Sequence, residues 1–321
     1  MKKIKKVIWL LVLIVLVFFS LKFWWSSQLL AVSSDNTSIV FVVDKGEGFS
    51  QVVTDLKKAS LIKSTWAFNI LTKQSDLMNK VQPGTFRLAK SKTSREILKI
   101  LTEQPLDNWV TLIEGWRVEE MADILNEKLT IDKGQFIKIA KEGYMFPDTY
   151  LFPKDYSVEQ ITKKLRDTFD LKYSSELKSK IKANGLTEAQ GVILASIVER
   201  EARTAGVRKM VASILLKRFK IGMGLNADAT IQYALGYQSD EKSWWKRHLS
   251  REDLKIDSLY NTYLHSGFPP TPICNPGLAS LEAVANADPS TPYLYYFHDS
   301  KGNSYYGKTL EEHNANVANY P

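Results

Sequence analysis

The hydrophobic pattern of the chain begins with a long apolar run. Residues 7–25 are all apolar except Ser20 and Lys22. A helix rises ~1.5 Å per residue, so a run of this length spans about 28 Å, close to the thickness of a bilayer core. We therefore predict a transmembrane anchor at 7–25 after a cytoplasmic tail at 1–6. A cleaved signal peptide is the alternative, because such peptides also carry an uninterrupted apolar core.

The flanks of this run predict its orientation. Four lysines precede it, and the pair Trp24 and Trp25 ends it. Lysines favour the cytoplasmic side, and tryptophans favour the membrane interface. The nearest small-residue cleavage site, at 31–33, lies beyond the bulky pair, which favours an uncleaved anchor. We predict a single-pass protein of the cytoplasmic membrane, with its amino terminus in the cytoplasm and the rest outside.

A polar tether at 26–38 precedes a stretch with alternating strand-like and helix-like patterns. In order, the predicted elements are a strand SIVFVV, helices near 49–60 and 65–75, a strand PGTFRL and a helix at 94–103. This βααβ order over 39–105 resembles the layout of a LysM-like peptidoglycan-binding module. A generic α/β subdomain has the same pattern.

A larger second region is predicted at 106–321. It opens with the strand-like VTLI, a turn at Gly115 and an amphipathic helix. Helical patterns dominate 157–220, whereas short strand-like and proline-rich stretches dominate 260–307. The predicted fold class is therefore α+β, with a mixed α+β domain after the small module.

Charge and composition exclude several classes of function. Five of the eight excess positive charges lie in residues 1–25, so the remainder has an ordinary balance and we predict no nucleic-acid partner. Cys274 is the only cysteine, and the four histidines are scattered without a metal-ligand spacing. We predict neither a metal site nor a cofactor.

One helix carries a candidate catalytic acid. Thr187 and Gln190 form a capping-box pattern before GVILASIVEREAR, a helix apolar on nearly all sides at its start. Glu199 continues the apolar stripe of this helix, and burial disfavours the charged form of a carboxyl, as a general acid requires. Glu201 lies about 200° further round the helix, so the two carboxyls cannot point into one cleft.

A simple ion pair is the competing interpretation of Glu199. Arg203 follows it by four residues, the better orientation for a helix ion pair. Such a pair contributes only ~0.5 kcal/mol and does not explain the apolar surroundings.

Polar and aromatic residues are dense further along the chain. IGMGLNADATIQYALG is followed by YNTYLHSGFPPTPICNPG and TPYLYYF. Aromatic faces together with hydroxyl and amide groups are what a sugar-binding groove requires. Tyrosines in strands are also common in protein cores, so this composition alone is weak evidence.

Five blocks are similar to the YceG-like endolytic murein transglycosylases: GYMFPDTYLFP at 143–153, LASIVEREA at 194–202, IGMGLNADATIQYALG at 221–236, YNTYLHSGFPPTPICNPG at 260–277 and LEEHNANV at 310–317. The resemblance covers the basic start, the LysM-like module and nearly all of 110–321. It implies that Glu199, the first glutamate of its block, is catalytic. The implied substrate-binding residues are Asn226, Asp228, Thr230, Tyr233, Tyr260, Asn261, Thr262, Tyr263 and Asn275. Asn226, Ala229 and Met145 depart from the family pattern.

The implied reaction cuts the bond between N-acetylmuramic acid and N-acetylglucosamine and leaves 1,6-anhydro ends, which would limit nascent strand length. One carboxyl suffices, first as acid and then as base. The implied partners are glycan strands and cell wall synthases. A hydrolytic muramidase with Asp228 as second carboxylate and a non-enzymatic wall-binding scaffold are the alternatives. SELK and SDN fit an acyl-serine motif, but their order is wrong and KTG is missing.

Overall fold

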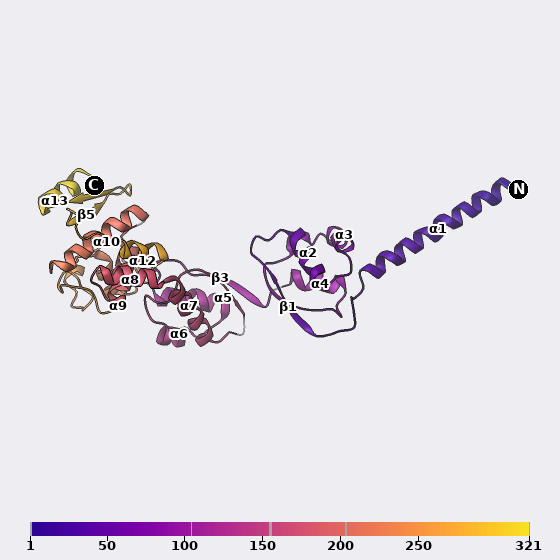
Figure 1. The fold of residues 1–321 in the computed structure, drawn as a ribbon, viewed down its shortest axis with the longest axis horizontal. Helices are drawn as coiled ribbons and strands as arrows, with labels where there is room; N and C mark the ends of the chain where they lie inside the picture. Colours follow the sequence, from indigo (N-terminus) through magenta and orange to yellow (C-terminus); the bar gives the residue numbers. More distant parts are fainter. Residues whose placement is uncertain (1, 104, 154–155, 203, 321) are drawn as a thin grey trace. The chain divides into compact units, whose positions relative to one another are not determined.

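The computed structural model describes residues 2–103, 105–153, 156–202 and 204–320, without the side chains of 2–8, 10 and 12. The chain forms two compact units, residues 1–109 with 151–155 and residues 110–150 with 156–321. Figure 1 labels their elements along the chain. The predicted division after residue 105 falls shortly before the observed one.

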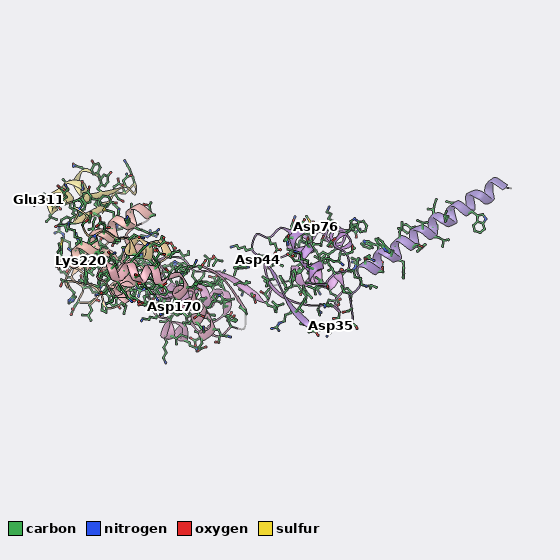
Figure 2. All side chains as sticks on the ribbon, in the orientation of Figure 1. Asp35, Asp44, Asp76, Asp170, Lys220 and Glu311 are labelled. Carbon is green, nitrogen blue, oxygen red and sulfur yellow. The ribbon has the colours of Figure 1, made fainter. Side chains whose placement is uncertain are left out.

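The chain starts with a helix, α1 (Lys2–Gln28). The described large apolar side chains of α1 are mostly exposed, Trp9 by 73% and Phe23 by 78%, and Figure 2 draws them as sticks. We predicted a membrane anchor at 7–25. Among the helices of the described part, none combines the length and the apolar character that a membrane crossing requires.

The first unit has the predicted βααβ order. Strand β1 (Ser38–Val43) pairs antiparallel with β2 (Gly84–Ala89), and helices α2 (Phe49–Lys58), α3 (Thr65–Gln74) and the 3-10 turn η1 (Met78–Lys80) lie between them in sequence. Helix α4 (Ser94–Thr102) begins with a capping box. The core of this unit is apolar, with Phe68 and Phe86 almost fully buried. Burial of such rings is the main stabilising term of a small module.

The second unit is mainly helical. Its own sheet is an antiparallel hairpin of β5 (Tyr295–His298) and β6 (Ser304–Gly307). Strands β3 (Asp107–Thr111) and β4 (Thr149–Pro153) pair with each other, and the bounds of the two units divide each of these strands. The helices are α5 (Val118–Leu129), α6 (Lys133–Ile139), α7 (Val158–Lys172), α8 (Ser175–Ala183), α9 (Glu188–Glu201), α10 (Ala205–Lys220), α11 (Asp228–Leu235), η2 (Asp253–Lys255), α12 (Leu278–Ala285) and α13 (Leu310–Asn319). The predicted mixed α+β class is confirmed at this level.

Helix α9 lies at the centre of the second unit. Its predicted capping box is present, with the Thr187 hydroxyl accepting from the Gln190 N–H and the Gln190 side chain accepting from the Thr187 N–H. Every residue from 191 to 198 is buried, and α9 packs against α8, α10, α11 and α12. A Cβ at Gly191 would lie 2.7 Å from the Ile181 side chain, so glycine allows this close packing. The buried helix carries both glutamates at its carboxyl end.

Candidate functional site

Glu199 lies in a nearly closed polar cluster. Its Oε1 accepts a hydrogen bond of 2.9 Å from Arg208 Nη2, and its Oε2 accepts one of 2.9 Å from the Gly277 N–H. The Glu199 side chain is only 5% exposed. Its recorded ion pair is thus with Arg208 on α10, whereas Arg203, the partner of the competing interpretation, lies outside the described residues.

Glu114 completes this cluster. Its Oε2 lies 4.0 Å from Arg208 Nη2, and its side chain is 47% exposed. Burial raises the pKa of Glu114, and the charge of Glu199 raises it further. A Cβ at position 277 would collide with the Glu114 carboxylate, so a larger residue there would require the Glu114 side chain to move. Within this cluster, both carboxylate oxygens of Glu199 accept hydrogen bonds from protein groups.

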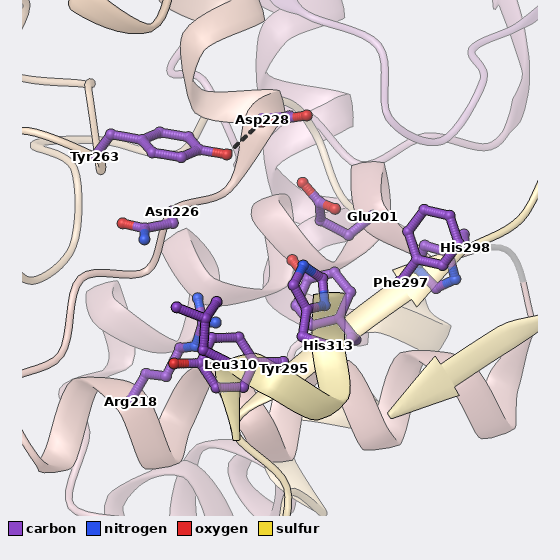
Figure 3. A pocket seen from close by; sticks show the side chains of 11 residues that line it. Glu201, Arg218, Asn226, Asp228, Tyr263, Tyr295, Phe297, His298, Leu310 and His313 are labelled. Atoms are coloured by element: carbon purple, nitrogen blue, oxygen red, sulfur yellow. Dashed lines mark hydrogen bonds between the residues drawn. The ribbon is translucent and has the colours of Figure 1, made fainter. Parts of the chain in front are cut away.

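Glu201 has different surroundings from Glu199. It lines two cavities, and in Figure 3 it stands among Asn226, Asp228 and His298. Its Oε1 accepts a hydrogen bond of 3.4 Å from the Ala229 N–H. The pKa of Glu201 is raised to about 7, first by burial and then by the charge of Asp228. A carboxyl with this pKa exists in both protonation states near neutral pH.

The first cavity, with a volume of about 470 Å³, is rich in rings. Tyr263 Oη donates a hydrogen bond of 2.6 Å to Asp228 Oδ1 at its edge (Figure 3). Its lining consists of Glu201, Arg218, Asn226, Asp228, Tyr263, Tyr295, Tyr296, Phe297, His298, Leu310 and His313. Rings beside amide and carboxyl groups suit a sugar, whose faces stack on aromatics and whose hydroxyls need polar partners.

The second cavity, of about 660 Å³, also reaches Glu201 and Asp228. Its other lining residues are Arg200, Thr204, Val207, Ala229, Gln232, Arg247, His248, His298, Asp299, Ser300, Lys301, Gly302 and Ser304. Both volumes fall in the range of roughly 300–1,000 Å³ that small-molecule sites occupy. The linings of the two cavities have Glu201, Asp228 and His298 in common.

Three of the predicted substrate-binding residues, Asn226, Asp228 and Tyr263, come together around the first cavity. Asn226 has φ +48°, a left-handed conformation that asparagine tolerates better than most residues. Helix α11 begins at Asp228, which brings the carboxylate to the amino-terminal end of that helix. The stretch after α10 thus contributes side chains to a polar cavity, and their binding of a substrate stays a prediction.

Three other predicted substrate-binding residues, Thr230, Thr262 and Asn261, make hydrogen bonds within the protein. Thr230 Oγ1 and Thr262 Oγ1 lie 2.9 Å apart in one hydrogen bond, and both residues are buried. Asn261 is fully buried and donates to the carbonyls of Leu254 and Ile256. These three side chains line neither cavity. Their hydrogen bonds stabilise the loops that carry Asn226 and Tyr263.

Asn275 is likewise a buried structural residue. Its side chain donates to the Trp116 carbonyl and, at 2.8 Å, to Glu142 Oε1, and it accepts from the Met145 N–H. Burial raises the pKa of Glu142 to about 8. Asn275 thus joins three segments that are far apart in the sequence and has no polar atom left for a substrate.

Tyr233 and Tyr260 pack together with ring centroids 4.8 Å apart. The Arg117 guanidinium lies over the Tyr233 ring, 4.1 Å from its centroid. The Tyr260 hydroxyl shares a hydrogen bond of 2.6 Å with Thr271. Neither tyrosine lines the two cavities around Glu201.

Sequence reasoning missed Glu201 and the residues of the β5–β6 hairpin. The helical angle separated Glu199 from Glu201 but could not tell which of them faces a cavity. TPYLYYF had the composition of a sugar site, and Tyr295, Tyr296 and Phe297 from this block do line the first cavity. Within the described part of the chain, no group of three or more His, Cys, Asp or Glu side chains is placed to hold a metal ion.

Comparison with known proteins identifies relatives of the whole chain. The chain is 30% identical to the endolytic murein transglycosylase of Bacillus subtilis (strain 168), over 90% of this chain and 86% of that protein. It is 26% identical to the endolytic murein transglycosylase of Streptococcus pneumoniae D39, over 91% of this chain but only 60% of that protein.

A solved structure also matches. The crystal structure of a yceG-like protein from Listeria monocytogenes aligns with a TM-score of 0.60 and 26% identity, over 87% of this chain and 98% of that one. The family model described as YceG-like matches residues 41–319, which is most of the chain. The chain therefore belongs to the YceG-like family.

Proposed function

We propose that this protein is an endolytic lytic transglycosylase that cuts peptidoglycan strands, with Glu201 as its acid and base. The observation that carries the proposal is a carboxyl with a pKa of about 7 lying between two cavities large enough for sugars. Relatives named endolytic murein transglycosylase support the substrate class. Glu199, which the resemblance implied, lines neither cavity, and its two oxygens bind Arg208 and the Gly277 N–H.

The proposed reaction needs one side chain in two protonation states. Protonated Glu201 gives its proton to the oxygen that joins N-acetylmuramic acid to N-acetylglucosamine, and the muramyl C1–O bond breaks. The glucosamine leaves with a free 4-hydroxyl. The Glu201 carboxylate then takes the proton of the muramyl 6-hydroxyl while O6 bonds to C1. The product is a 1,6-anhydro end, and Glu201 regains its proton.

A matched pair of variants tests this assignment. Glu201→Gln keeps the size of the side chain but cannot transfer the proton, so we expect roughly a thousandfold loss of anhydro-ended fragments. Glu199→Gln should keep most of its activity per folded molecule. Chromatography with mass spectrometry of digested strands measures both. The reverse ranking of the two variants would return the catalytic role to Glu199.

A hydrolytic muramidase is the second candidate function. Asp228 faces the same two cavities as Glu201, and its charge raises the Glu201 pKa. A second carboxylate across the bond is what hydrolysis by a bound water requires. Digestion in water enriched in oxygen-18 separates the two reactions: hydrolysis places the label at the new reducing end, whereas internal ring closure leaves the product unlabelled.

A location outside the cytoplasmic membrane follows from the proposed substrate, because peptidoglycan is built there. Protease treatment of intact cells without their outer layers tests it. Degradation of the catalytic unit supports this location, and protection until the membrane is lysed contradicts it. We also propose that the protein limits the length of glycan strands and contacts wall synthases. Longer glycan strands in cells that carry Glu201→Gln would support the proposed limit on strand length.

A further inference from the structure

The two cavities around Glu201 differ in the charge that they offer a ligand. The first cavity contains Arg218, which is only 5% exposed. Arg218 Nε donates at 2.6 Å to the Leu294 carbonyl, and its Nη1 donates at 2.7 Å to the Leu225 carbonyl. Carbonyls of the protein thus bind two nitrogens of this guanidinium. The other side chains that line only the first cavity are rings, one amide and one leucine, namely Tyr263, Tyr295, Tyr296, Phe297, His313, Asn226 and Leu310.

The second cavity presents two exposed cations. Arg247 comes from the loop between α11 and η2, and Lys301 comes from the turn of the β5–β6 hairpin. For Arg247 and Lys301, the described part of the chain contains no ion-pair partner. Two exposed cations without an ion pair in the lining of one cavity favour an anionic ligand.

The acids of the second cavity leave this preference in place. Asp299 accepts hydrogen bonds from the backbone N–H groups of Lys301 and Asn303 and from the Asn303 side chain, so it closes the hairpin turn. The remaining acids, Glu201 and Asp228, lie where the two cavities meet. Arg247 and Lys301 line only the second cavity, whereas Glu201 and Asp228 line both.

A peptidoglycan strand has a matching asymmetry. Its glucosamine units are uncharged, whereas each muramyl unit carries a lactyl ether and a stem peptide with carboxylates. We infer that the second cavity takes the peptide-bearing muramyl unit, with Arg247 and Lys301 binding a stem-peptide carboxylate, and that the first cavity takes the adjoining glucosamine. This inference rests on the proposed function. It fixes the direction in which the strand crosses Glu201.

Two substrates that differ only in charge test the inference. Purified strands with free stem-peptide carboxyls are compared with the same strands in which these carboxyls are amidated. We expect the wild type to have about tenfold higher kcat/KM on the free-carboxyl strands, because charge-assisted hydrogen bonds to Arg247 and Lys301 are lost on amidation. In the double variant Arg247→Gln/Lys301→Gln, the ratio between the two strands should fall to near one.

A control variant removes two charges elsewhere in the same unit. Lys138 and Lys164 are exposed and line neither cavity, so Lys138→Gln/Lys164→Gln should keep the wild-type ratio. A wild type that cuts both strands equally, or a double variant that keeps the preference, would overturn the inference and leave the proposed function intact. A folded wild type that cuts neither strand would overturn both.

Binding provides a readout that does not depend on turnover. In Glu201→Gln, a muramyl-peptide disaccharide with free carboxyls should bind about tenfold more tightly than its amidated form. Adding Arg247→Gln and Lys301→Gln should abolish that difference. Equal affinities before these two substitutions would contradict the inference, even if the strand-cutting activity is present.

Discussion

The two glutamates at the end of α9 have opposite surroundings although only Arg200 separates them. Glu199 is 5% exposed and binds Arg208 and the Gly277 N–H. Glu201 opens onto two cavities and faces the like charge of Asp228. Burial therefore does not distinguish the two carboxyls. The difference is that Glu201 lines cavities in which a ligand could reach it, whereas Glu199 lines neither.

The largest effect on stability that we expect from this comparison is that of Glu199→Gln. The substitution removes a charged partner from Arg208, whose side chain is only 14% exposed. A charged hydrogen bond lost at a mostly buried site should lower the free energy of unfolding by about 2 kcal/mol. Chemical denaturation measures this change. An unchanged midpoint would mean that the Arg208 contact contributes little and that Glu199 has another role.

The pH dependence of kcat in the Asp228→Asn variant tests whether Glu201 is the group that titrates. In the wild type the Glu201 pKa is raised to about 7, so the protonated acid that starts the reaction is lost as pH rises through that value. Without the charge of Asp228, the Glu201 pKa should fall. Above its midpoint, each unit of decrease lowers the protonated fraction about tenfold.

The alkaline limb of the pH profile of kcat should therefore move to lower pH in the Asp228→Asn variant. Tyr263→Asn is not suited as its control, because Tyr263 contacts Asp228 directly. Asp170→Asn is the better control, because this exposed carboxylate pairs with Arg166 and lines neither cavity. A limb that stays in place in Asp228→Asn would indicate that another group titrates.

Thr187→Ala lowers stability without touching either glutamate. Thr187 caps the far end of α9, and loss of such a cap costs about 1 kcal/mol. Thermal denaturation should show the loss, whereas kcat at a temperature well below the transition should stay at the wild-type value. A fall in kcat would imply that the amino-terminal end of α9 positions Glu201 more tightly than the packing indicates.

The smallest effect is expected for Tyr263→Phe. It removes the hydrogen bond of 2.6 Å to Asp228 from a side chain that is 38% exposed. Partial exposure lets water replace the hydroxyl, so we expect only about a threefold rise in KM. Steady-state kinetics with the free-carboxyl strands measures it. A loss as large as that of Glu201→Gln would place Tyr263 in the chemical step.

Local patterns predicted much of the fold. The strand SIVFVV and the helices that follow it lie close to the predicted ranges, and the capping box at Thr187 and Gln190 is present. Such elements depend on residues a few positions apart, which a sequence displays directly. The predicted anchor at 7–25 is helical in the structure, but its position in a membrane stays a prediction.

Long-range partners explain what the sequence could not show. The resemblance implied that Asn275 binds substrate, and its side chain donates hydrogen bonds to the Trp116 carbonyl and to Glu142, both before α9. The choice between Glu199 and Glu201 likewise depends on Gly277 and on the β5–β6 hairpin, which follow α9 by many residues. Helix geometry could separate the two glutamates but could not assign their neighbours.

The buried thiol of Cys274 makes the catalytic unit convenient for measuring its own opening. Cys274 is fully buried, donates a hydrogen bond to the Ser196 carbonyl, and is the only cysteine of the chain. Burial raises its pKa, which further slows reaction with thiol reagents. Ser196 lies on α9, so a thiol reagent can reach Cys274 only when this helix separates from the segment before α12. The rate of labelling of Cys274 therefore measures local unfolding at this contact.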